Sequence, residues 1–253
     1  MGLQQYWGKR NFKETPEPRG ASQSPSERLQ FVIQQHAASR LHYDFRLELA
    51  GTLKSWAIPK GPSLDPARKR LAVHVEDHPL DYGGFEGIIP PKQYGAGTVL
   101  LWDRGSWSPV GDPMASYRRG RLKFNLKGHK LRGLWNLVRM GGRQEQGKDN
   151  WLLFKENDDE ARTGEQAEVT QLLTTSVASR RTIEQIASDC HRVWQSNHPV
   201  AKQAKSIPRP HKMGTKKLVG ARRTPQEDSI RPQLATLADE APVGEEWVHE
   251  LKY

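Results

Sequence analysis

Side chains that suit metal and phosphate chemistry alternate along residues 42–49. On a β-strand, His42, Asp44, Arg46 and Glu48 project from one face, because successive side chains of a strand point to opposite faces. Two imidazoles, from His42 and from His36 six residues upstream, can hold a divalent metal ion together with one carboxylate. A guanidinium on the same face can bind an anionic oxygen. The combination predicts chemistry on a phosphate group.

An ordinary solvated strand face is the plain alternative, since half-buried strands normally alternate apolar with polar residues. A second segment weighs against it. In residues 71–78, His74, Glu76 and His78 alternate with the apolar Val73 and Val75. Two amphipathic strands that both carry imidazoles and acids on their polar sides favour a functional site over a solvated surface.

The chain has 39 Lys and Arg against 29 Asp and Glu, a formal net charge of +10. This surplus favours a polyanionic partner, most commonly nucleic acid, although it does not separate DNA from RNA. No apolar run of about 18 residues and no N-terminal apolar targeting segment occurs, which disfavours a membrane protein. The single cysteine, Cys190, excludes an internal disulfide and a cysteine-rich zinc site. We therefore expect a cytoplasmic protein.

Short alternating segments separated by Gly and Pro turns predict eight strands. They are expected at residues 28–35, 42–50, 53–58, 71–76, 98–104, 122–126, 133–138 and 151–155. Many short strands without a βαβ rhythm predict a mainly β fold, a compact, closed or nearly closed antiparallel barrel. Five tryptophans are expected in its core or rim: Trp56, Trp102, Trp107, Trp135 and Trp151.

The remaining segments are expected to flank or extend this barrel. Residues 1–28, rich in Pro, Ser, Gln and charge, predict a flexible arm. Residues 169–194 have helical spacing and predict one or two helices on the barrel edge, within a domain of residues 29–195. Residues 196–231 predict a basic disordered linker, and residues 232–253 the beginning of a further domain.

Several motifs, in their order along the chain, resemble the 3'-phosphoesterase domain of bacterial DNA ligase D. They are HYDFRLE at 42–48, WAIPKGP at 56–62, VEDHPLDY at 75–82 and FEGIIP at 85–90. Residues 9–18 resemble the N-terminal signature of the family, and the likeness covers roughly residues 6–190. The final ELKY at 250–253 resembles the start of the ATP-dependent ligase motif Lys-x-Asp-Gly, without its Asp-Gly.

The resemblance implies a manganese-dependent enzyme that heals DNA 3' ends during nonhomologous end joining, on a compact β-barrel with flanking helices. A phosphodiesterase step would remove a terminal ribonucleoside from a primer-template and leave a 3'-phosphate. A phosphomonoesterase step would then give the 3'-hydroxyl that a ligase needs. The implied partners are DNA 3' ends, the ligase and polymerase domains of the end-joining system, and Ku.

Carried over residue by residue, the resemblance makes His36, His42 and Asp44 the ligands of Mn²⁺ or another divalent metal. It also implies a set of catalytic and phosphate-binding residues: Arg46, Lys60, Arg70, Glu76, His78 and Tyr82. Glu17 matches a position on the arm, which would have to fold over the site. On the residues alone, Lys60 is equally well explained as a surface lysine of a turn and as a contact to the ligand. A solvated charge is the alternative for Glu17.

Two rival functions stay open. A catalytically inactive module that binds metal and DNA ends would explain the positive charge, but not why His36, His42, Asp44, Arg46 and His78 occur together. An ATP-dependent ligase would need a nucleotidyltransferase domain after Lys252, so no ligase activity is expected from this chain alone. The chain is then either the N-terminal portion of a multidomain ligase D or a stand-alone protein.

Overall fold

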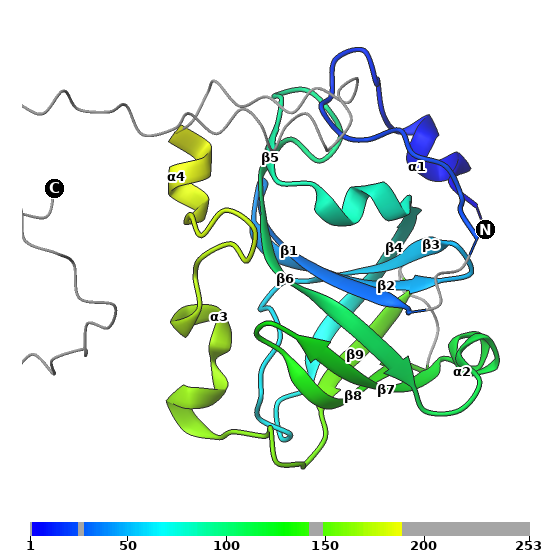
Figure 1. Ribbon diagram of the computed structural model, residues 1–253, viewed down its shortest axis with the longest axis vertical. Helices are drawn as coiled ribbons and strands as arrows, with labels where there is room; N and C mark the ends of the chain where they lie inside the picture. Colours follow the sequence, from blue (N-terminus) through cyan, green and yellow to red (C-terminus); the bar gives the residue numbers. More distant parts are fainter. Residues whose placement is uncertain (1, 25–27, 142–148, 189–253) are drawn as a thin grey trace, which may run out of the picture. The chain divides into compact units, whose positions relative to one another are not determined.

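A closed antiparallel β-barrel forms the core of the computed structural model, which describes residues 2–24, 28–141 and 149–188 (Figure 1). The strands are β1 (Gln30–Ala37), β2 (Leu41–Leu49), β3 (Thr52–Ile58), β4 (Arg70–His78), β5 (Gly87–Ile89), β6 (Gly97–Pro109), β7 (Arg121–Gly128), β8 (Arg132–Arg139) and β9 (Asn150–Lys155). Eight of them follow the order β1-β2-β3-β4-β9-β8-β7-β6, and β1 pairs with β6 to close the ring. This confirms the mainly β barrel. The short β5, which was not predicted, adds to the start of β6.

Short helices and turns cover parts of this barrel. They are α1 (Gln4–Gly8), η1 (Leu80–Gly84), α2 (Pro113–Arg119), η3 (Gly164–Ala167), α3 (Val169–Leu172) and α4 (Ile183–Ser188). The segment predicted as one or two helices contains α3 and α4, which an irregular stretch separates. None of the helices in the described ranges is long and apolar enough to cross a membrane.

Aromatic side chains fill the barrel interior. Phe45 of β2 stacks on Phe124 of β7 with ring centroids 5.9 Å apart, and these strands are not neighbours in the sheet, so the contact crosses the interior. Trp56 and Trp151 meet edge to face at 5.6 Å. All five tryptophans predicted for the core or rim are at most 2% exposed, which confirms that prediction. Large buried rings contribute much apolar area and hold the strands at fixed spacing.

A β-bulge in β4 divides its polar residues between the two faces of the sheet. Leu53 of β3 pairs with His78 and Ser55 with Val75, so Glu76 and Asp77 together lie opposite one residue of β3. The extra residue reverses the alternation of side chains. His74 therefore packs in the interior against Trp56, and the prediction that His74 shares a face with Glu76 and His78 was wrong.

The N-terminal segment, predicted as a flexible arm, packs on the barrel over residues 2–24. Tyr6 of α1 is fully buried among residues of a second apolar cluster that includes Tyr82 and Phe85. Its hydroxyl donates a hydrogen bond to the Pro18 carbonyl at 2.5 Å, so the segment folds back on itself. Composition suggested disorder, because the average polarity of a segment does not reveal that single side chains such as Tyr6 and Glu17 become buried.

Two of the predicted regions lie outside the described residues. These are the basic linker at 196–231 and the beginning of a further domain at 232–253.

Asp103 of β6 organises the turn between β7 and β8. Its carboxylate is fully buried and accepts the backbone N–H groups of Arg104, His129 and Lys130 at 2.9–3.0 Å, and that of Leu131 at 2.8 Å. Asp103→Ala leaves these donors without an acceptor and should lower the free energy of unfolding by about 2–4 kcal/mol. Urea denaturation measures it, with Asp103→Asn losing less and the exposed Asp81→Ala serving as control. A wild-type urea midpoint for Asp103→Ala would contradict this role.

Candidate active site

Three candidate metal ligands converge on the outer face of β1 and β2. His36 and His42 are directly paired across these antiparallel strands, and Asp44 lies two residues further along β2. One nitrogen of each imidazole and a carboxylate oxygen all lie within 4.8 Å of one another. Among the described residues this is the group that could hold a metal ion, and it is the set predicted from the sequence.

Backbone carbonyls fix which nitrogen of each imidazole faces the carboxylate. His36 Nε2 lies 2.9 Å from the Gly95 carbonyl, and His42 Nδ1 lies 3.0 Å from the Arg40 carbonyl. Because a carbonyl oxygen only accepts, each of these nitrogens carries the proton in the neutral ring. The lone pairs of His36 Nδ1 and His42 Nε2 are left facing Asp44, 3.8 and 3.7 Å from its oxygens. Both rings are therefore oriented for metal binding by their second nitrogen.

The Asp44 carboxylate is held in its charged form. Burial alone would raise its pKa, but the guanidinium of Arg46 is the largest opposing influence and the pKa is lowered to about 2. Arg46 Nη2 donates to Asp44 Oδ2 at 3.0 Å. Above about pH 2, the Asp44 carboxylate can therefore bind a metal ion without first losing a proton.

Arg46 is the central cation of the site and is only 2% exposed. Its Nε donates to Gln34 of β1 at 2.8 Å, and its Nη1 donates to Ser55 of β3 at 2.8 Å. The guanidinium carbon lies 4.9 Å from the ring centroid of Tyr82. These contacts tie together β1, β2, β3 and η1, and they fix the guanidinium beside the metal ligands.

His78, 3% exposed, stands between two guanidinium groups. Arg10 Nη2 lies 3.2 Å from its Nε2, and Arg46 Nη1 lies 2.9 Å from its Nδ1. Arg10 only donates, so Nε2 accepts and the proton of the neutral ring lies on Nδ1, which donates to the Glu76 carbonyl at 2.9 Å. Nδ1 then has no lone pair for Arg46, whose contact with the ring is one of charge and proximity. Burial, with the charges of Arg46 and Arg10, holds the pKa of His78 well below its usual range.

Arg10 is a site residue that the sequence analysis did not identify. Its side chain is 4% exposed and binds two acids, Glu17 at 2.8 Å and Glu76 at 3.2 Å. Lys9 also binds Glu76, at 3.0 Å. The Glu76 side chain thus anchors the N-terminal segment. Its pKa is lowered overall, because its hydrogen bonds and the charges of Arg10 and Lys9 outweigh the effect of burial.

The structure brings most of the predicted site residues around one cavity of about 190 Å³. The lining includes nine polar residues: Arg10, Glu17, His36, His42, Asp44, Arg46, Glu76, His78 and Tyr82. Glu17 is fully buried, so the alternative of a solvated charge was wrong. Burial raises the pKa of Tyr82, whose hydroxyl is therefore a neutral donor.

Two predicted phosphate contacts lie elsewhere. Lys60 is exposed in the turn after β3, and Arg70 at the start of β4 donates to both carboxylate oxygens of Glu168, at 2.9 and 2.7 Å. Neither side chain lines the cavity. Their contact with phosphate stays a prediction without support from this geometry.

Comparison with known proteins points to one family. Residues 34–139 match the family model of the DNA ligase D 3'-phosphoesterase domain. The multifunctional non-homologous end joining protein LigD of Pseudomonas aeruginosa is 47% identical over 252 residues, which cover 99% of this chain and 28% of that protein. Its counterparts from Mycobacterium tuberculosis and Mycolicibacterium smegmatis are 41% and 38% identical, over 60% and 62% of this chain and 19% and 21% of their own lengths. The chain thus spans less than a third of each of these relatives.

The lowered pKa of His78 should make the stability of the protein depend on pH. Below about pH 6.5 the unfolded chain takes up a proton that the folded protein does not. The free energy of unfolding therefore decreases as the pH is lowered in that range, by up to about 1.4 kcal/mol per pH unit for one proton. His78→Gln should reduce this slope by up to about 1.4 kcal/mol per pH unit, the contribution of one proton. His74, whose pKa burial also lowers, keeps its own contribution.

Urea denaturation at several pH values between about 5 and 7 measures the slope. The exposed His129→Gln is the matched control and should behave as wild type. Equal slopes for wild type and His78→Gln would contradict the neutral, buried state of His78.

Proposed function

We propose that the cavity hydrolyses phosphate esters at DNA 3' ends and prepares those ends for joining, because residues 34–139 match the family model of the DNA ligase D 3'-phosphoesterase domain. The observation that carries this proposal is the gathering of a metal-ligand triad, Arg46 and His78 around one cavity. The proposed activities are a phosphodiesterase that removes a 3'-terminal ribonucleoside and a 3'-phosphomonoesterase.

The proposed metal is Mn²⁺. Two imidazole nitrogens and a carboxylate, without a thiolate, form a donor set that suits Mn²⁺ and other divalent ions of intermediate softness. Their free lone pairs and the ionised carboxylate fit such an ion without rearrangement of protons. When bound, the ion would polarise a phosphoryl oxygen and neutralise its charge.

The cavity and its rim are balanced in charge before metal and substrate enter. Three cations, Lys9, Arg10 and Arg46, face three acids, Asp44, Glu17 and Glu76. A divalent metal and a phosphate dianion bring opposite charges of equal size, so their joint entry keeps this balance. Either one alone disturbs it, and electrostatics therefore favours binding of the pair.

The guanidinium of Arg46 would bind nonbridging oxygens, since its fork suits phosphate geometry. A phosphate dianion next to His78 would raise the pKa that Arg46 and Arg10 now hold down, because a nearby negative charge favours the imidazolium. In the monoesterase step, water attacks phosphorus and the bond from phosphorus to the 3'-oxygen breaks. We assign His78 as the acid that protonates this leaving oxygen, and Tyr82 as a neutral donor to the phosphate.

The wider setting is also proposed. The relatives are named as multifunctional non-homologous end joining proteins, which supports DNA ends as the substrate. The ligase and polymerase domains of the end-joining system are proposed partners. Primer-templates with a 3'-ribonucleotide or a 3'-phosphate are the proposed substrates, and Ku is a further proposed partner. The proposed location is the bacterial cytoplasm.

Asp44→Asn tests the assignment, because it removes a metal-binding charge while keeping the shape of the side chain and an oxygen for Arg46. Turnover of a labelled primer-template ending in one ribonucleotide, or in a 3'-phosphate, should fall by more than about 100-fold with Mn²⁺. EDTA should abolish the wild-type activity. Asp112→Asn, at the exposed N-cap of α2, is the matched control and should retain full activity.

Equal turnover by Asp44→Asn and wild type would refute the metal site. A wild-type protein that binds these ends and releases no nucleoside or phosphate with Mn²⁺, Mg²⁺ or Co²⁺ would instead favour an inactive end-binding module.

A further inference from the structure

A basic groove lies on the barrel over β6, β7, the start of β8 and the segment that leads into β1. We define it by Arg28, Arg104, Lys127 and Arg132, which line one cavity of about 650 Å³. All four side chains are exposed, and none of them forms an ion pair with another residue in the described ranges. No acidic residue lines this cavity. Such uncompensated positive charge repels itself and is available to an anionic partner.

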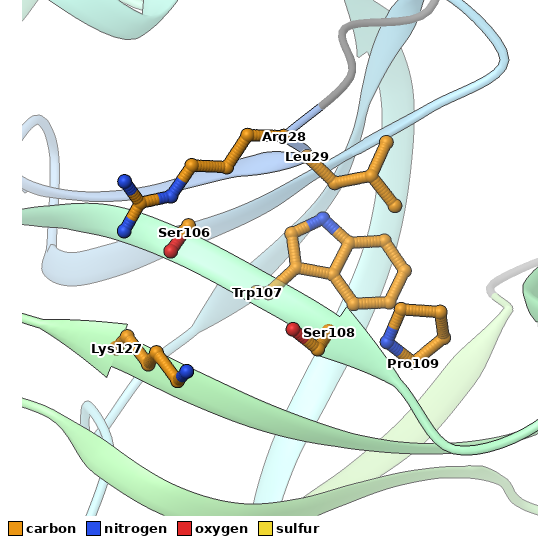
Figure 2. Close-up of a pocket in the computed structure, with 7 residues that line it drawn as sticks. All are labelled: Arg28, Leu29, Ser106, Trp107, Ser108, Pro109 and Lys127. Carbon is orange, nitrogen blue, oxygen red and sulfur yellow. The ribbon is translucent and has the colours of Figure 1, made fainter.

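A second cavity of about 310 Å³ shares Arg28, Ser106 and Lys127 with the first. Figure 2 shows Arg28 and Lys127 on either side of the β6 segment that carries Ser106 and Ser108. Besides the four cations, half of the residues that line the first cavity are small: Gly83, Gly84, Gly105, Ser106 and Gly128. Cations at the sides and small residues between them let a phosphodiester backbone approach the strands closely.

The strand register places this groove on the same face of the sheet as the candidate active site. Arg46 of β2 pairs with Val32 of β1, and Val32 pairs with Arg104 of β6, so these three side chains form one row across the strands. Strands lie about 4.8 Å apart, which puts the backbones of Arg46 and Arg104 about 10 Å apart. Each strand of a duplex carries one phosphate per about 3.4 Å of axis, so this spacing corresponds to roughly three nucleotides.

The 3₁₀ helix η1 connects the two sites directly. Tyr82 lines the active-site cavity, and the next two residues, Gly83 and Gly84, line the groove. A strand whose 3' end enters the cavity therefore meets the groove within a few nucleotides of that end.

We propose that this groove binds the phosphodiester backbone of the DNA duplex behind the 3' end. The inference rests on the proposed function, since it takes the DNA end to lie in the cavity. Contacts to backbone phosphates position a duplex without reading its sequence, which suits an enzyme that must accept ends of any sequence. Binding should depend strongly on salt, because each phosphate contact releases counterions.

The test compares two triple variants of the full chain that lose the same charge. The groove variant carries Arg104→Gln, Lys127→Gln and Arg132→Gln. The control variant carries Lys69→Gln, Arg118→Gln and Arg121→Gln, which are exposed cations outside the groove. Fluorescence anisotropy with EDTA, to prevent turnover, gives the Kd for a labelled duplex of about two helical turns with a 3'-phosphate. Circular dichroism establishes that both variants are folded.

The groove variant should bind at least about tenfold more weakly at low salt, and the slope of log Kd against log salt should fall by about 2–3. The control variant should stay within about twofold of wild type. Wild-type affinity of the groove variant, or equal losses in both variants, would overturn the proposal. Turnover of the same duplex by the wild-type protein with Mn²⁺ is measured separately. Its absence would contradict the phosphoesterase function and leave the comparison of Kd values intact.

Discussion

The buried guanidinium of Arg46 is the interaction on which the site depends. A charge that is 2% exposed is tolerated only when it is paired and hydrogen-bonded, and Arg46 meets this condition through Asp44, Gln34 and Ser55. The same contacts hold the Asp44 carboxylate ionised for metal and fix the pairing of three strands at the cavity. Together with burial, the guanidinium also holds the pKa of His78 well below its usual range. The contacts that stabilise the fold around Arg46 thus include the ion pair that keeps Asp44 ionised.

The N-terminal segment completes this electrostatic arrangement. Arg10 brings a second guanidinium to His78 and neutralises two acids, Glu17 and Glu76, that line the cavity. Removal of one partner from such a buried pair leaves an uncompensated charge, which is strongly unfavourable. The ion pair of Arg10 with Glu76 therefore both attaches the N-terminal segment to the barrel and brings a positive charge to the cavity. In the proposed function, this arrangement encloses a phosphate between two guanidinium groups beside a metal.

The sequence was informative where chemistry and alternation agree. The spacing of His36, His42 and Asp44 predicted the triad, because an uninterrupted antiparallel pair keeps alternate residues on one face. It failed at His74, since alternation cannot reveal a bulge that depends on the pairing of β3 with β4. It also missed Arg10, whose role arises from a fold-back over 66 and 68 positions of sequence to Glu76 and His78. Motif resemblance marked that segment, but composition predicted disorder.

The most direct measurement is an anomalous difference map at the manganese absorption edge, from crystals grown with Mn²⁺ and inorganic phosphate. We predict one manganese peak within coordination distance of His36 Nδ1, His42 Nε2 and Asp44. We also predict a phosphate that touches both that ion and the guanidinium of Arg46, with His78 Nε2 within hydrogen-bond distance of a phosphate oxygen. A manganese peak away from these three ligands, or a phosphate bound without Arg46 and His78, would contradict the account.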